Sequence, residues 1–235
     1  MSNNRQSSSP IPGLALDELF PQEEHFIHHQ SNIHGVDHVA RVICHSIDLV
    51  KEHGPAEYLA PAWAAAFLHD LARRTDGVCN RHGQWAVDDC WDLHVERFRR
   101  AGVGPEWDER IKAAVINHCD RDNLEKSDPA WRLAAFLKDA DALDRYRLNE
   151  SPDPRMLRFE HADEVYFRAE KLEYETYGCA DGMEVWAARQ VLDTDAEVSP
   201  EFAHGEELPA VPHIDPSHQL DLDIGPPGGG KESHR

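Results

Sequence analysis

Apolar residues recur at every third or fourth position along most of this chain, and the strict alternation typical of β-strands is nearly absent. The segment 36–51 shows this spacing most clearly, with Val36, Val39, Ile43 and Ile47 on one helical face. Comparable spacing predicts further helices over 60–74, 82–102, 105–119, 129–148, 161–177 and 181–192. The pattern therefore predicts an all-α fold, in which one compact helical bundle occupies residues 25–200.

Residues that commonly begin or end helices support several of these predicted helix boundaries. Ser31 or Asn32 is a candidate N-cap for the first helix, and Gly54 follows its last turn. Pro61 and Pro129 suit the first turns of two others. Outside the bundle, we expect a disordered or irregular arm over 1–24, rich in Ser, Asn and Pro over 1–12, and a low-complexity, disordered tail over 201–235.

Bulk composition narrows the class of protein. The chain has 235 residues and a formal net charge of -20, which argues against a nucleic acid or an anionic membrane as its partner. The five cysteines form no C-x-x-C pair, so we expect a reduced, cytoplasmic protein without a disulfide framework. We also expect no signal peptide and no membrane-spanning segment.

Candidate chemistry starts from the stretch AAFLHDLARR, which places His69 and Asp70 after a run of apolar residues. A lone His-Asp pair is ordinary, but the order of similar residues along the chain is not. The candidates are His38, with His34 four residues before it, then His69-Asp70, His82, His118, and Asp141 with Asp139 and Asp144 beside it. Each lies on or at the end of a different predicted helix, which is how a bundle assembles a metal centre.

The remaining histidines do not share this pattern. His25, His28 and His29 fall in a polar segment where we expect them to be solvated. We expect His45, His53, His94 and His161 to be surface or helix-end residues.

This ordered set resembles the HD superfamily of metal-dependent phosphohydrolases, whose pattern is H…HD…D on a bundle of helices. The similarity lies in H-x-x-R-V at 38–42, in Leu68-His69-Asp70 and in K-x-A-D-x-L at 138–143. The resemblance implies a metal site between helices. It implies that His38, His69, Asp70 and Asp141 are the core ligands, and that His82 and His118 are the extra ligands of members with two ions. Asp70 would then bridge both ions.

Imidazole and carboxylate donors favour Mn, Fe, Co, Ni or Zn over an all-oxygen calcium site. One or two such ions would activate water and neutralise phosphate. Arg73, Arg74 and Lys138 are the nearest candidates to contact a phosphorylated substrate, because phosphoryl transfer requires positive charge around the equatorial oxygens. His34 or Asp76 is a candidate general acid or base.

Three functions remain open at this point. The first is hydrolysis of a nucleotide or another small phosphorylated metabolite by metal-activated water. The second is a di-iron oxygenase that uses the six-ligand H…HD…H…H…D set, and the third, less favoured, is a non-catalytic ligand-binding module. The chain lacks the Glu-Asp pair of the alarmone hydrolases and the HDIGK and GYP signatures of the cyclic-dinucleotide phosphodiesterases, so the substrate is left open.

Overall fold

The computed structural model describes residues 9–28, 31 and 33–198, and this part of the chain contains helices and no strand. The α-helices are α1 (Val36–His53), α2 (Leu59–Leu68), α3 (His82–Arg100), α4 (Asp108–His118), α5 (Trp131–Leu143), α6 (Asp163–Thr176) and α7 (Gly182–Val198). The all-α prediction is confirmed. Over the described residues, no helix combines the length and the apolar character that crossing a membrane requires.

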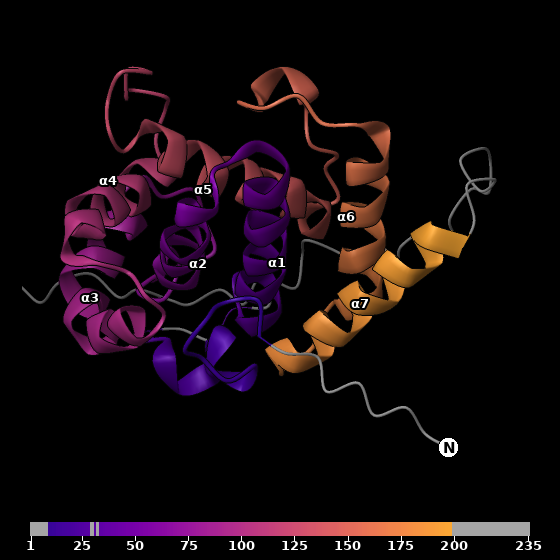
Figure 1. The fold of residues 1–235 in the computed structure, drawn as a ribbon, viewed down its shortest axis with the longest axis horizontal. Helices are drawn as coiled ribbons and strands as arrows, with labels where there is room; N and C mark the ends of the chain where they lie inside the picture. Colours follow the sequence, from indigo (N-terminus) through magenta and orange to yellow (C-terminus); the bar gives the residue numbers. More distant parts are fainter. Residues whose placement is uncertain (1–8, 29–30, 32, 199–235) are drawn as a thin grey trace, which may run out of the picture. The chain divides into compact units, whose positions relative to one another are not determined.

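Helices α1 and α2 form the centre of the bundle (Figure 1). Helix α1 packs against α2, α5 and α7, while α2 also packs against α3 and α4. The pairs α3–α4 and α6–α7 lie on opposite sides of this centre (Figure 1). The central position agrees with the sequence, because α2 is apolar all round and Val39, Ile43 and Ile47 of α1 are fully buried.

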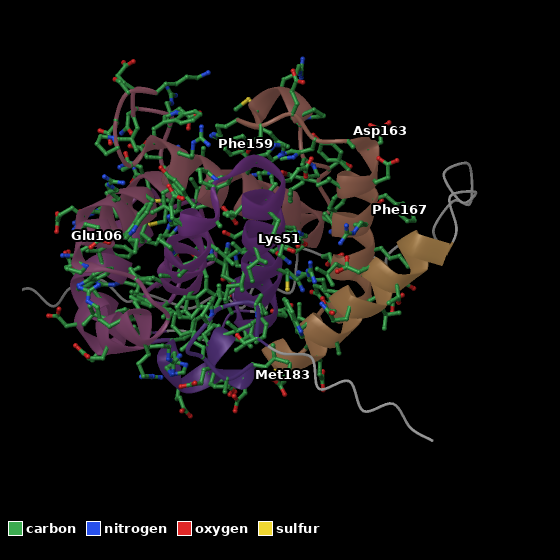
Figure 2. The ribbon with its side chains drawn as sticks, in the orientation of Figure 1. Lys51, Glu106, Phe159, Asp163, Phe167 and Met183 are labelled. Carbon is green, nitrogen blue, oxygen red and sulfur yellow. The ribbon has the colours of Figure 1, made fainter. Side chains whose placement is uncertain are left out.

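Side chains from all of these helices fill the interior (Figure 2). Trp63 and Phe67 of α2 meet Phe98 of α3 edge-on, and they contact each other in a tilted arrangement. These large buried rings connect α2 to α3.

The prediction of a helix over 60–74 is wrong for the last residues of that range. Helix α2 ends at Leu68, and the chain then turns through tighter bonds, in which the amide of Leu71 donates to the carbonyl of Leu68 and that of Arg73 to Asp70. The Arg73 guanidinium donates to the carbonyls of Thr75 and Gly77, which holds the chain in this turn. His69 and Asp70 therefore lie just beyond the end of α2 and not within a helix.

The beginning of α1 also differs from the expectation. Its N-cap is Gly35, without a capping side chain, whereas the Ser31 hydroxyl accepts the amides of Ile33 and His34 in the preceding turn. Asn32 lies outside the described residues. Gly54 does end the helix, since its amide donates to the carbonyl of Val50.

The expected N-terminal arm packs onto the bundle where it is described. Residues 9–24 are irregular apart from short 3-10 helices at Asp17–Leu19 and Glu23–His25. However, Ile11, Leu19 and Phe20 are fully buried, and the Trp63 indole donates to the Leu19 carbonyl at 2.8 Å. The expectation of disorder is wrong for this segment, because these apolar side chains complete the core. Residues 1–8 and the tail predicted over 201–235 lie outside the described residues.

Several histidines expected at the surface are buried. His45 of α1 and His94 of α3 are buried, and the His161 side chain is fully covered. The His25 ring packs edge-on against Phe67 and His94 instead of being solvated. His94 packs against Phe67 and His161 meets Tyr166 edge-on, and local spacing along the chain does not reveal such contacts. His53 does lie at a helix end, as the last residue of α1.

Helices α3 and α4 approach each other closely at Gly83, and we predict that Gly83→Ala destabilises the protein. A Cβ at this position would lie 2.1 Å from the backbone oxygen of Val115. Glycine to alanine within a helix normally stabilises by about 0.5–1 kcal/mol, but here the clash is expected to cost about 1–3 kcal/mol. Urea unfolding measures the difference.

The matched control is Gly77→Ala, since the nearest atom to a Cβ there is the Thr75 hydroxyl at 4.0 Å. This variant is expected to unfold within about 0.5 kcal/mol of the parent chain. Equal stability of the two variants would contradict the close approach of α3 and α4.

Candidate metal centre

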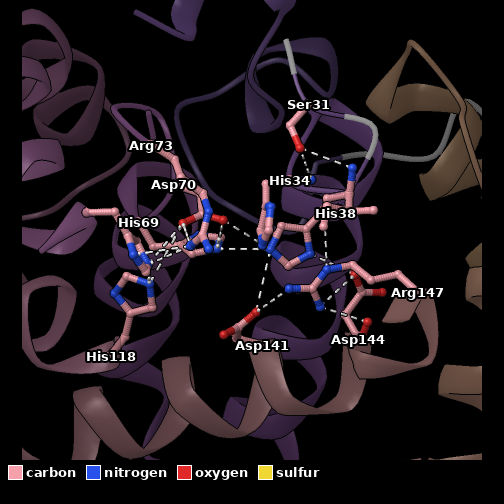
Figure 3. Close-up of polar contacts among 12 residues, drawn as sticks. Ser31, His34, His38, His69, Asp70, Arg73, His118, Asp141, Asp144 and Arg147 are labelled. Carbon is pink, nitrogen blue, oxygen red and sulfur yellow. Dashed lines mark hydrogen bonds and ion pairs between the residues drawn. The ribbon is translucent and has the colours of Figure 1, made fainter. Parts of the chain in front are cut away.

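Four histidines from separate helices bring their ring nitrogens together in the bundle. His38 is the third residue of α1, His69 follows α2, His82 begins α3 and His118 ends α4. The Nε2 atoms of His38 and His69 are 3.2 Å apart (Figure 3). Those of His82 and His118 are 2.8 Å apart. All four side chains are buried. We call these histidines, together with Asp70 and Asp141, the ligand cluster.

Asp70 lies between two halves of the cluster. Its Oδ2 atom is 3.5 Å from His38 Nε2 and 3.7 Å from His69 Nε2. Its Oδ1 atom is 3.2 Å from His82 Nε2 and 3.9 Å from His118 Nε2. One carboxylate oxygen therefore faces each pair of histidines, as a bridging ligand requires.

Asp141 belongs to the first half. Its Oδ1 atom is 3.5 Å from His38 Nε2, and the ligand atoms of His38, His69 and Asp141 all lie within 4.8 Å of one another. The structure thus brings together all six residues that the sequence proposed as ligands. Figure 3 labels five of them: His38, His69, Asp70, His118 and Asp141.

The hydrogen bonds of the four rings fix their tautomers. The Nδ1–H groups of His69, His82 and His118 donate to the carbonyls of Ala66, Cys79 and Val115, at 2.7, 2.9 and 2.5 Å respectively. The Nδ1–H group of His38 donates to Asp144 Oδ2 at 2.7 Å. Because these oxygens only accept, each Nδ1 carries a proton. Burial lowers the pKa of His69, His82 and His118, so these three rings are neutral and present an Nε2 lone pair to the cluster.

The tautomers give the cluster an unsatisfied, electron-rich interior. The Nε2 lone pairs of His82 and His118 face each other at 2.8 Å, and buried Asp70 Oδ1 has no hydrogen-bond donor within the described part of the chain. Such an arrangement is unfavourable unless a cation lies among these atoms. The donors therefore fit a divalent transition ion, with the outer ring nitrogens hydrogen-bonded as metal-binding histidines usually are.

Local structure explains why these rings point inward. His69 and His118 each follow a helix end, where the carbonyls of the last turn lack partners within the helix. Their Nδ1–H groups satisfy carbonyls three residues back, at Ala66 and Val115. The same hydrogen bond thus caps the helix and directs Nε2 toward the cluster.

Electrostatics favour ionised carboxylates in the cluster. Burial raises the pKa of Asp70, but the neighbouring His69 and a hydrogen bond with His38 outweigh it and hold this pKa well below its usual range. Burial acts likewise on Asp141, where Arg147 and the histidines prevail and lower the pKa to about 2.

The histidine pKa values fall into two groups. Burial, together with His82 and His69, lowers the pKa of His118 to about 3, so this ring stays neutral and able to bind a cation. For His38, burial and Arg147 lower the pKa, yet its hydrogen bonds with Asp144 and Asp70 raise it above the ordinary value overall.

A buried network around Asp144 supports His38 from behind. Asp144 lies in the 3-10 helix Asp144–Leu148 that follows α5, and its Oδ1 accepts from Arg41 Nε at 2.5 Å. Arg147 donates to the Asp144 carbonyl and lies 3.4 Å from Asp141 Oδ1. From the sequence, Asp144 was expected only to lie beside Asp141, and neither Arg41 nor Arg147 was expected to support the ligand cluster. Arg41 lies within the H-x-x-R-V motif, which was the available signal.

Of the residues proposed from the sequence as substrate contacts or as acid or base, Arg73 and His34 lie at the cluster, and Asp76 contacts His34. The Arg73 guanidinium contacts the His82 ring nitrogens at 3.1 and 3.2 Å and is 3.6 Å from Asp70 Oδ1. The His34 ring packs edge-on against His38 (Figure 3), and its Nδ1 is 3.1 Å from Asp76 Oδ1.

The other two are engaged elsewhere. Arg74 is half-exposed, lies over the Trp85 ring and faces Asp89 at 3.6 Å. The Lys138 ammonium group donates to the Asp120 carbonyl and to Asp122, in the loop that follows α4. The sequence alone could not distinguish Arg73 from Arg74, because the two residues are adjacent. The turn after α2 directs their side chains to different surroundings.

No family model, curated protein or solved structure matches this chain. The interpretation of the cluster therefore depends on its own geometry: two pairs of facing imidazoles, one carboxylate between them and a further carboxylate on one side.

We predict that Asp144→Asn weakens metal binding about 10- to 100-fold while the chain stays folded, because the amide lacks the charge that orients His38. Isothermal titration of the metal-free protein with Mn²⁺ or Zn²⁺ measures the change.

Asp153→Asn is the matched control, since Asp153 is more exposed and pairs with Arg155 two residues away. Its affinity is expected to equal that of the parent chain. Unchanged affinity in folded Asp144→Asn would show that Asp144 does not position the ligands.

Proposed function

We propose that this chain is a metal-dependent hydrolase of phosphate esters, acting on a nucleotide or another small phosphorylated metabolite. The observation that carries the proposal is the ligand cluster, in which Asp70 presents one oxygen to His38 and His69 and the other to His82 and His118. Paired sites with a shared carboxylate are suited to stabilising both the attacking and the leaving oxygen of a displacement at phosphorus.

On this proposal, the ligand cluster would hold two ions, each bound by a different group of residues. His38, His69 and Asp141 would hold one with Asp70 Oδ2, while His82 and His118 would hold the other with Asp70 Oδ1. A divalent ion supplies a water of lowered pKa and neutralises charge on a phosphate oxygen. Asp144 and the carbonyls of Ala66, Cys79 and Val115 keep the rings oriented for this task.

Arg73 is the proposed phosphate-binding residue. Its guanidinium is fixed by the carbonyls of Thr75 and Gly77 and lies beside His82 and Asp70. A planar guanidinium held in this way offers directed donors to phosphate oxygens. A local positive charge is needed to bind an anionic phosphate, because the chain as a whole carries a formal charge of -20.

His34 and Asp76 are the pair proposed to position the attacking water. Burial lowers the pKa of His34 to about 4, so the ring is neutral near pH 7. Its Nδ1–H group donates to Asp76 Oδ1 at 3.1 Å, which leaves Nε2 as an acceptor. The ring thus offers Nε2 as a hydrogen-bond acceptor for a water molecule, and Asp76 holds the ring in this tautomer.

A di-iron oxygenase is the alternative. The same observation favours it, since six His and Asp side chains around a shared carboxylate also suit two irons. The two functions differ in their need for oxygen, and this difference decides the experiment.

The test is anaerobic phosphate release from a panel of nucleotides and phosphorylated metabolites, with Mn, Co, Ni, Fe, Zn and Mg tried separately. We expect release with at least one transition ion, and a loss of about 10³-fold or more in Asp70→Ala and Asp141→Ala. Asp153→Ala, on the surface, is the control and is expected to retain activity. Absence of release with every metal, from folded protein, would refute the proposal; two irons per chain and oxygen-dependent turnover would support the alternative.

The adjacent arginines provide a separate prediction on substrate binding. Arg73→Ala is expected to lower kcat/KM by about 10- to 1000-fold, because it removes a guanidinium beside the reacting phosphate. Arg74→Ala is expected to stay within about twofold of the parent, since that side chain faces Asp89 and Trp85. Equal losses in both variants would contradict the assignment of Arg73.

A further inference from the structure

A second group of metal-binding side chains lies at the other end of α1. Glu52 and His53 end this helix, and His161 lies just before α6. His53 is 15 residues after His38, which is about 22 Å along an α-helix. Figure 2 labels Phe159 near this end of the helix, where its ring stacks on His53 with centroids 5.0 Å apart. The group is therefore separate from the ligand cluster.

The spacing of the donor atoms suits a tetrahedral ion. His53 Nε2 is 3.3 Å from His161 Nδ1 and 3.5 Å from Glu52 Oε1. Two imidazole nitrogens bound at about 2.0–2.1 Å to a tetrahedral Zn²⁺ are separated by about 3.3 Å. The three ligand atoms lie within 4.8 Å of one another, and the exposed Glu52 side leaves room for water as a fourth ligand.

The environment of His161 provides independent support. Its side chain is fully buried, and its Nε2 atom has no hydrogen-bond partner among the described residues. This atom faces Asp139 Oδ2 at 3.7 Å, while Asp139 accepts from the backbone amides of Arg158 and Phe159. An ion on Nδ1 would make Nε2–H a stronger donor toward Asp139, in the carboxylate–histidine–metal arrangement of many zinc sites.

Both rings are held before any ion binds. The His53 ring is nearly parallel to Phe159, at 6°, and the His161 ring meets Tyr166 edge-on. The carbonyls at the C-terminal end of α1 add a partial negative charge that favours a cation at this position. Little conformational entropy is therefore lost on binding.

We propose that Glu52, His53 and His161 bind a divalent transition ion of the zinc class. Two nitrogens and one carboxylate oxygen favour such an ion over Mg²⁺ or Ca²⁺. The ion attaches the segment 149–162, which connects the end of α5 to α6, to the end of α1. The proposal stands independently of the phosphohydrolase function.

The test counts zinc ions on the full chain. Metal-free protein is titrated with Zn²⁺ in competition with a chromophoric chelator, for the parent chain, His53→Phe and His161→Asn. The phenylalanine retains the stack on Phe159 and removes the ring nitrogens, including the ligand atom Nε2. We expect each variant to bind one zinc ion fewer than the parent, and Glu52→Gln to bind the same ion at least about tenfold more weakly.

His28→Asn is the matched control, because it removes a part-exposed histidine near Asp89 and keeps the rest of the chain unchanged. It is expected to bind as many ions as the parent chain. Limited proteolysis of 149–162 gives a second readout: zinc is expected to slow cleavage in the parent and in His28→Asn, but not in His53→Phe. Circular dichroism confirms folding, and His53→Phe remains informative if His161→Asn fails to fold. An unchanged zinc count in folded His53→Phe would overturn the proposal.

Discussion

The buried carboxylate of Asp70 is the constraint on which the centre of this bundle depends. An ionised carboxylate in a protein interior requires opposing charge or several donors. Here the rings of His69, His82 and His118 donate their Nδ1–H groups to outer carbonyls and present Nε2 lone pairs toward Asp70. Helix ends, turn and hydrogen bonds thus arrange a set of donor atoms that fits a cation.

The same constraint explains the network behind His38. Asp144 orients the His38 ring and is itself neutralised by Arg41, whose guanidinium also reaches Asp37 and the carbonyl of Thr176. The amide of Gly178 donates to Asp37 as well. Through these bonds, the orientation of one ligand is connected to the packing of α6 against α1, so the outer helices contribute to the geometry of the centre.

Much of the fold followed from the sequence because its helices are long and their apolar faces are regular. The six proposed ligands also lie together, as their order along different helices predicted. What the sequence did not provide depends on contacts between distant residues. Asp144 is 106 residues from His38, and no local pattern joins them.

The errors have a similar origin. Periodicity continued α2 to Arg74, although the chain turns after Leu68, and it therefore gave Arg73 and Arg74 equal roles. The irregular residues 9–24 lack a helical pattern, yet Ile11, Leu19 and Phe20 are covered by the bundle. In both cases tertiary contacts decided what local spacing left open.

The charge at the centre connects metal binding with the proposed substrate. Four carboxylates, of Asp37, Asp70, Asp141 and Asp144, stand against the three guanidinium groups of Arg41, Arg73 and Arg147. Without an ion this group has a negative balance, inside a chain that is itself strongly negative, and would repel a phosphate. A divalent ion reverses the local sign, and a second one strengthens the reversal. On the proposed function, metal binding therefore precedes substrate binding, because the anion is attracted only to the metal-loaded centre.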